Sequence, residues 1–165
     1  MHRVNAIIHD ERFIKRMKEI QEYEADRIFC KHGYDHLIAV ARIAYILAFE
    51  TKEKNPDYHM PEKEIIYAMA ILHDIGKFLD DEMGMNHRDI GPILAAPILK
   101  DVGFSEEETE MICHAIKMHG TYPEDKGSLA GLLYIADKKA RRCFDCPAHD
   151  ECNWPDEKKN EVLYG

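Results

Sequence analysis

The sequence has no apolar stretch long enough to cross a membrane. Its longest uninterrupted apolar runs, residues 65–72 and 43–49, fall well short of the roughly 18 to 20 residues that a transmembrane helix needs. The first dozen residues are broken by charges and lack the apolar core and small-residue cleavage site of a secretory signal. The expectation is therefore a cytoplasmic protein without a membrane partner.

Proline and glycine are also scarce, at 7 and 9 residues, whereas 45% of the residues are apolar. This composition argues against disorder and favours a chain that buries a core. Because domains usually contain about 100 to 200 residues, the 165 residues are expected to form one domain, residues 1–165.

Basic residues are fewer than acidic ones. The sequence has 22 Lys and Arg residues and 31 Asp and Glu residues, for a net charge of −9. Such a balance opposes long-range attraction to a nucleic-acid polymer or to an anionic membrane. A phosphate-bearing substrate would therefore have to be attracted by local groups. The charge leaves the oligomeric state open, and a homo-oligomer is compatible with it.

The alternation typical of strands is scarce, and apolar residues instead recur at every third or fourth position. This pattern predicts an all-α fold, a compact bundle of about six helices with an irregular C-terminal tail. Pro61 suits the first turn of a helix, Gly103 a helix end, and Ser105 with Glu108 a capping box. The expected helices cover approximately residues 11–29, 34–50, 61–78, 86–100, 105–120 and 128–142.

Several of the 10 histidines and some aspartates lie on faces that should be buried. The third expected helix is apolar on every side and leads into His73 and Asp74. Helical spacing places His36 on an aliphatic stripe and Asp137 beside Leu133. A buried carboxylate costs several kcal/mol unless it is paired or metal-bound. Neither aspartate has an evident Arg or Lys on the same face, so a metal ion is the expected partner.

Two further histidines follow the same pattern. His119 shares a stripe with Ile112, whereas His114 lies nearly opposite, so His119 should point inward and His114 outward. His87 aligns with Gly91, where another backbone or a ligand could come close. Neutral imidazoles and ionised carboxylates are good ligands for Zn, Fe or Mn. For any one histidine taken singly, a core histidine bonded to a carbonyl is the alternative.

The order of these residues resembles the HD-domain superfamily of metal-dependent phosphohydrolases. The resemblance rests on His36 early in a helix, on His73 and Asp74 in the segment AILHDIGK, and on Asp137 in LLYIADKKARR. It covers residues 29–142 as an HD-type metal-binding core and leaves residues 143–165 as a Cys-containing tail. The family implies that these four residues bind one metal ion in an all-α bundle.

Two more segments, NHRDIGPIL with His87 and HAIKMHG with His119, are similar to a branch of the superfamily that holds two metals. This branch includes the bacterial diadenosine tetraphosphate hydrolases with iron. The resemblance implies two divalent or mixed-valence ions, with Asp74 between them and His87 and His119 on the second. Iron is expected first, and Mn, Zn, Co or Ni would also fit. A ligand role for His114 stays open, because some relatives place two histidines in this helix.

The activity implied by the resemblance is hydrolysis of a phosphate ester or anhydride in a nucleotide or other small phosphorylated metabolite by a metal-activated hydroxide. Asp74 is expected to orient this nucleophile. Lys77 is expected to reach a substrate phosphate, and Arg88 and Lys138 are further substrate-binding candidates. The alternatives are a solvated surface charge for Lys77 and Arg88, and a cation that favours a helix C-terminus for Lys138.

Three rival functions remain. The first is a single-metal nucleotide phosphatase in which His87 and His119 bind substrate instead of metal. The second is a non-catalytic protein that uses the same fold to sense a nucleotide or a metal. The third and most remote is a dinuclear iron oxygenase, which would use similar ligands.

The odd number of cysteines, 5, suits metal ligands or reduced thiols better than a disulfide framework. The tail places Cys143, Cys146, His149 and Cys152 at steps of three, enough ligands for a small structural zinc or iron–sulfur site. A redox pair or free thiols are the alternatives. Cys30 and Cys113 stand isolated in the sequence.

Overall fold

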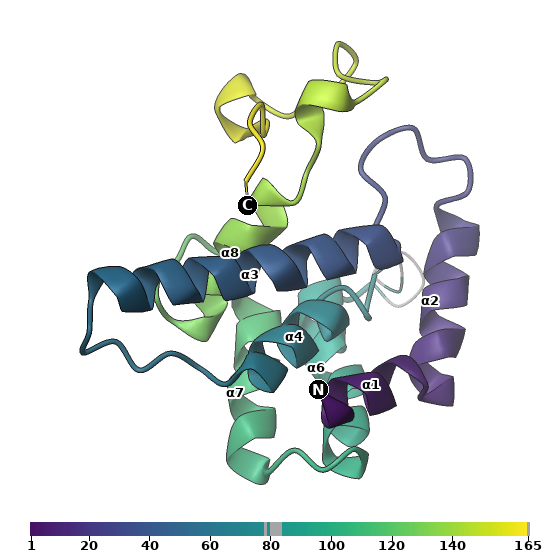
Figure 1. Ribbon diagram of the computed structural model, residues 1–165. Coiled ribbons are helices and arrows are strands. Elements are labelled where there is room, and N and C mark those ends of the chain that lie inside the picture. The colour runs from purple at the N-terminus through teal and green to yellow at the C-terminus, as the bar shows by residue number, and fades with distance from the viewer. Residues whose placement is uncertain (78, 80–83, 165) are drawn as a thin grey trace.

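Figure 1 shows the computed structural model, which describes residues 1–77, 79 and 84–164. These residues contain seven α-helices and no strand, so the predicted all-α fold is confirmed. None of the helices among them is both long and apolar enough to span a membrane. The helices are α1 (His2–Ile8), α2 (Glu11–Tyr23), α3 (Tyr34–Lys54), α4 (Lys63–Leu72), α6 (His87–Asp101), α7 (Glu106–Met118) and α8 (Leu129–Lys139), followed by the short 3₁₀ helices η1 (Cys143–Asp145) and η2 (Asp156–Lys158).

The helix starts follow local capping chemistry. The hydroxyl of Ser105 accepts a hydrogen bond from the amide of Glu108 at 3.1 Å, and the Glu108 carboxylate accepts one from the amide of Ser105 at 2.8 Å. This is the predicted capping box at the start of α7. Asn86 and Ser128 cap α6 and α8 in the same way, each with a side-chain acceptor. Gly103, with φ of 94°, follows α6, where glycine is favoured because it lacks a Cβ.

Several predicted helix bounds are wrong. The first expected helix ends at Tyr23 rather than near residue 29, because Glu24 turns inward and accepts a hydrogen bond from the amide of His32 at 2.7 Å. The second runs on to Lys54 instead of stopping at residue 50. The third covers only Lys63–Leu72, so Pro61 precedes it, and its expected end, Phe78, lies outside the described residues.

The N-terminal helix α1 was not predicted from the sequence. A helix of 7 residues is too short to be stable on its own and depends on tertiary contacts. Arg3 supplies them by pairing with Glu64 at 2.8 Å and with Glu108 at 2.8 Å. Val4 and Ile7 are buried in the core. Contacts between residues this distant in sequence leave no periodic signal.

Helix α4 lies at the centre of the bundle and contacts α1, α3, α6, α7 and α8 (Figure 1). Seven of its ten residues are buried, as expected for a helix that is apolar on every side. Around it, α3 packs against α8, and α7 packs against both α6 and α8. The residues that follow α4 therefore lie in the middle of the protein.

The turn after α4 packs directly on α6 through two glycines. A Cβ on Gly76 would lie 2.6 Å from the carbonyl oxygen of His87 and 2.9 Å from the nitrogen of Gly91. On the other side, a Cβ on Gly91 would lie 2.9 Å from Cγ2 of Ile116. Only glycine allows these approaches. The close backbone contact predicted at Gly91 is present, and it brings the start of α6 beside Asp74.

Candidate metal centre

The six inward-facing side chains predicted from the sequence come together in one place. The Oδ2 atom of Asp74 lies 3.0 Å from Nε2 of His73 and 3.9 Å from Nε2 of His36. Its other oxygen, Oδ1, lies 3.9 Å from Nε2 of His119. Asp137 Oδ1 lies 3.3 Å from Nε2 of His36. Ligand atoms within 4.8 Å of one another form two groups that share Asp74, namely His36, His73 and Asp74, and Asp74, His87 and His119.

Helix ends supply these side chains. Where the ends of several helices meet, their inward-facing side chains can surround one point. His73 and His119 are the C-terminal caps of α4 and α7, and Asp74 follows in the turn. The others come from the first turns of α3 and α6 and the last turn of α8, at His36, His87 and Asp137.

Backbone carbonyls orient two of the imidazoles. Nδ1 of His73 donates to the carbonyl of Ala70 at 2.7 Å, and Nδ1 of His119 donates to the carbonyl of Ile116 at 2.6 Å. With Nδ1 held by a carbonyl, Nε2 is the ring nitrogen that faces the carboxylates and is placed to bind a metal. The Nε2 atoms of His36 and His73 are buried without an aligned hydrogen bond. A bound metal ion would remove the cost of such unpaired nitrogens, so the residues present fit a metal.

Burial and charge together set the protonation of the site. Burial lowers the pKa of His36, and it lowers the pKa of His119 to about 4 with a further contribution from His73. Both imidazoles are therefore neutral near pH 7. Burial opposes ionisation of Asp74 and Asp137. For Asp74 the charge of His73 outweighs burial, and for Asp137 the combined effect of His36, Lys138 and His73 does, so both pKa values lie below the ordinary value. For His73, burial is outweighed by Asp74, and its pKa is raised.

Asp137 has cationic partners, contrary to the expectation from the sequence. Nζ of Lys138 lies 2.7 Å from its Oδ2 atom, and Nη2 of Arg141 lies 3.6 Å from the same oxygen. Arg141 follows by four residues and so shares the helical face of Asp137. Lys138 is the next residue in the sequence, and its long side chain folds back so that its ammonium group reaches the Asp137 carboxylate. The expected lack of an Arg or Lys partner is therefore wrong for Asp137.

A cleft of about 290 Å³ opens over the carboxylates and histidines. The three predicted substrate-binding cations all line it. The guanidinium of Arg88 crosses Gly120, where a Cβ would lie 2.3 Å from Nη1. In a chain whose net charge is −9, the cleft thus concentrates positive charge, with five basic lining residues, Arg27, Lys77, Arg88, Lys138 and Arg141.

Sequence reasoning missed two residues beside the cleft. His32 lines it, and its ring and backbone amide both bond to the carboxylate of Glu24, which is 3% exposed. Burial raises the pKa of Glu24, but the bonds from His32 outweigh it and the pKa is lowered. His32 lies in a loop, so helical spacing could not place it. The imidazoles form a row with centroids 5.4–5.6 Å apart, through His32, His36, His73, His119 and His87.

The other predicted candidates lie elsewhere. His114 is exposed on α7 and does not line the cleft. The four tail candidates, Cys143, Cys146, His149 and Cys152, lie after α8, apart from the two groups that share Asp74.

Comparison with known proteins agrees with the helical fold. Residues 33–142 match the HD domain family, and the chain belongs to this family. An uncharacterized protein from Clostridium beijerinckii is 42% identical over 166 residues, which cover 99% of both chains. Ribonuclease Y from Enterococcus faecalis is 31% identical over 103 residues, or 62% of this chain and 17% of that protein. Ribonuclease Y from Helicobacter hepaticus is 29% identical over 109 residues, or 66% of this chain and 18% of that protein.

This chain therefore spans less than a fifth of each ribonuclease Y. No solved structure matches it significantly. HD-domain proteins are in general hydrolases that bind divalent metal ions, and the groups around Asp74 could hold such ions. Membership thus points to metal-dependent phosphohydrolase chemistry in general.

Proposed function

We propose that this protein hydrolyses a phosphate ester or anhydride of a nucleotide or other small phosphorylated metabolite, using a dinuclear centre. The observation that carries the proposal is the position of Asp74, which belongs to both ligand groups and lies in a cleft lined by five cations. One carboxylate shared by two ligand groups is the arrangement expected of a two-metal site. The cations supply the local attraction for phosphate that the acidic chain otherwise lacks.

The ligand sets follow from the two groups. In the proposal, one ion is held by His36, His73, Asp74 and Asp137, and the second by Asp74, His87 and His119. When bound, such ions lower the pKa of a coordinated water and neutralise charge on a phosphate. Iron is the proposed metal, with Mn, Zn, Co or Ni as alternatives that suit the same imidazole and carboxylate ligands.

In the proposal, side chains of the protein orient the nucleophile and bind the substrate. Asp74, ionised near neutral pH, orients the nucleophile and can accept its proton on a carboxylate oxygen. Lys77 and Arg88 bind phosphate oxygens, and the planar guanidinium of Arg88 can do so with two parallel hydrogen bonds. Lys138 adds positive charge to the same lining while it pairs with Asp137. Lys77 and Arg88 thus position the substrate rather than transfer protons.

The size and charge of the protein favour a small substrate. The cleft volume of about 290 Å³ is near the lower end of small-molecule sites, which start at about 300 Å³. A net charge of −9 opposes binding of a polymer. A phosphodiester bond in a short RNA is the second candidate, because two relatives are named ribonuclease Y.

The test is a substrate panel with the purified protein loaded with iron, manganese or zinc. The panel contains nucleoside phosphates, dinucleoside polyphosphates, a generic phosphate ester and a short RNA. We expect metal-dependent hydrolysis of a small phosphorylated compound, and loss of this hydrolysis in Asp74→Ala together with loss of metal. Cleavage of RNA alone would favour the second candidate. A fully metal-loaded protein that hydrolyses nothing in the panel would overturn the proposal and favour a sensor.

A further inference from the structure

Cys30 is far from the other cysteines in sequence, but in the folded protein it lines the same cleft as residues at both ends of the Cys-containing tail segment. Cys30 lies in the loop between α2 and α3. The residue is exposed at the surface. Partial burial of the thiol raises its pKa, Arg141 opposes this, and the tail thiols add to the rise. Its cleft neighbours Arg141 and Trp154 lie two residues before Cys143 and two residues after Cys152. Cys30 is therefore not isolated in the folded protein. The tail thiols concerned are Cys143, Cys146 and Cys152.

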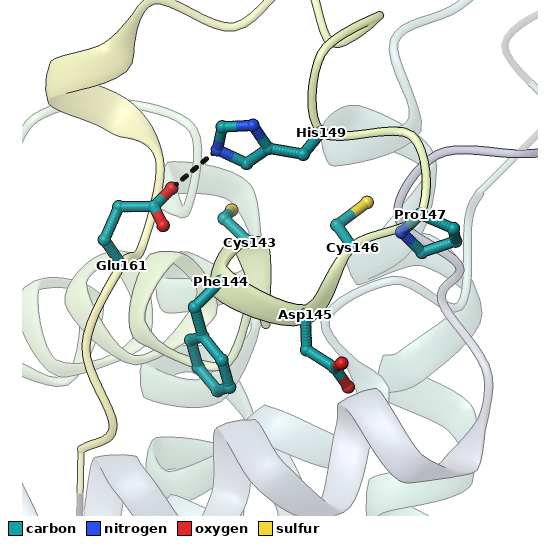
Figure 2. A pocket seen from close by; sticks show the side chains of 7 residues that line it. All are labelled: Cys143, Phe144, Asp145, Cys146, Pro147, His149 and Glu161. Carbon is teal, nitrogen blue, oxygen red and sulfur yellow. Dashed lines mark hydrogen bonds and ion pairs between the residues drawn. The ribbon is translucent and has the colours of Figure 1, made fainter.

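The tail carries its thiols on consecutive turns. The amide of Cys146 donates to the carbonyl of Cys143 at 3.2 Å, and the amide of Cys152 donates to the carbonyl of His149 at 3.2 Å. Figure 2 shows Cys143 and Cys146 leaving the backbone on the same side, opposite Phe144. A cavity of about 520 Å³ lies beside these side chains. Cys143 and Cys146 thus face one region, as ligands of a metal-binding loop require.

His149, the fourth ligand suggested by spacing, is engaged elsewhere. Its Nδ1 atom lies 3.2 Å from Asp150, and its Nε2 atom lies 3.0 Å from Glu161 (Figure 2). Both ring nitrogens thus have carboxylate partners, which raise the pKa of this exposed imidazole. A metal would have to displace one of these partners to bind the ring. Cys30 is the better fourth ligand, since it completes a set of thiols.

Other contacts hold the tail against the end of α8 and fix the loop that carries Cys30. Asn160 donates to the carbonyls of Lys139 and Arg141 at 3.0 and 2.7 Å. The guanidinium of Arg141 stacks 4.1 Å from the ring centroid of Trp154. In the loop, Arg27 donates to the carbonyl of Cys30 at 2.9 Å. The cations Arg27 and Arg141 lie where thiolate charge would need compensation.

We propose that Cys30, Cys143, Cys146 and Cys152 bind a thiolate-preferring metal, either zinc or an iron–sulfur cluster, at a second site separate from Asp74. Among the described residues, only the two groups around Asp74 place three ligand atoms within 4.8 Å of one another. Binding therefore draws the tail thiols inward and releases the thiol protons to solvent. The site ties the tail to the loop that carries Cys30 and His32 at the rim of the cleft.

The experiment measures metal in variants built on Asp74→Ala, so that the central site contributes as little as possible. Protein is purified without oxygen, and zinc, iron and acid-labile sulfide are measured per chain. We expect Cys30→Ser and Cys146→Ser to lose the remaining metal by about tenfold or more. The matched control is Cys113→Ser, because Cys113 lies on α7 and contacts the carbonyl of Pro92 at 3.6 Å. It should keep the metal, as should His149→Ala.

Retention of metal in Cys30→Ser at the level of Cys113→Ser would overturn the proposal, as would the absence of metal in all of these proteins. Because a serine variant can fail to fold, cobalt(II) is also titrated into metal-free Asp74→Ala protein with intact cysteines. Four thiolates should produce an intense sulfur-to-cobalt charge-transfer band, which weak oxygen or nitrogen ligation would not produce. Hydrolysis by the protein with intact Asp74 is tested separately, so failure of either proposal leaves the other standing.

Discussion

Oδ1 of Asp74 lies 3.9 Å from Nε2 of His119. The other oxygen of the same carboxylate faces His36 and His73, at 3.9 and 3.0 Å. One side chain therefore joins histidines from α3, the end of α4 and the end of α7. Because each oxygen of Asp74 faces a different group of ligands, a change to His119 should affect the group with His87 and leave the group with His36 and His73 in place.

The first prediction separates the two histidines of the α7 segment. His119→Gln should lower the metal content by about half and reduce turnover by on the order of 10³-fold, since metal stabilisation of phosphate charge amounts to several kcal/mol. His114→Gln is the matched control, and it should leave both quantities unchanged because His114 is exposed. Metal analysis and steady-state kinetics give the two readouts. Equal metal content in both variants would contradict a second ion at His119.

The second prediction concerns the cations of the cleft. Arg88→Ala should raise KM by roughly 10- to 100-fold, because a hydrogen bond between charged groups contributes about 1.5 to 3 kcal/mol. The effect should shrink as salt is added. Lys117→Ala is the control, because Lys117 lies on α7 with 61% of its side chain exposed, paired with Asp89. If the two variants showed the same KM, Arg88 would not bind the substrate.

The third prediction tests the close backbone contact between the turn after α4 and α6. Gly76→Ala places a Cβ 2.6 Å from the carbonyl of His87, so one of the two segments must move. We expect the free energy of unfolding to fall by about 1 to 3 kcal/mol, the usual cost of overpacking. Urea denaturation measures it. In the control, Gly33→Ser, the new Cβ has its nearest neighbour at 4.0 Å and stability should barely change.

The fourth prediction is a pH dependence of stability in metal-free protein. The pKa of His119 falls from 6.5 to about 4 on folding, chiefly because the imidazole is buried. Between these values the unfolded chain binds more protons than the folded chain, so stability is full above about pH 6.5 and is lost as the pH falls toward 4. The loss should be on the order of 3 kcal/mol, from about 1.4 kcal/mol per pKa unit.

The comparison for this prediction is His119→Gln, which cannot take up the proton. The raised pKa of His73 acts in the opposite direction, but it is present in both proteins and largely cancels in the difference. Urea unfolding at pH 7 and pH 4.5 in the presence of a chelator gives that difference. If both proteins lost the same stability on acidification, burial of a neutral His119 would be refuted.

Local patterns allowed much of the bundle to be predicted. Helical spacing distinguished the buried His119 from the exposed His114, because the turn of a helix relates neighbours three and four residues apart. The capping box at Ser105 was readable for the same reason. Arg141 shares the face of Asp137 at the same spacing, so its role as a partner was also available from the sequence.

Other features depended on contacts between distant segments. The bond between Glu24 and His32 joins a helix end to a loop, where no periodicity indicates direction. Helix α1 forms because Arg3 reaches Glu64 and Glu108. Cys30 lies near the tail because the loop after α2 and the segment after α8 line the same cleft.

The sequence by itself determined the helical class, the family and the inward faces of the histidine- and aspartate-bearing helices, since each depends on spacing within one segment. Only the tertiary structure decided that Asp74 stands between two groups of histidines and that Cys30 belongs with the tail. The physical reason is that the spacing of apolar residues along one helix indicates which side of that helix is buried. Which helix ends meet depends instead on the packing of side chains between helices and on the close contact at Gly76.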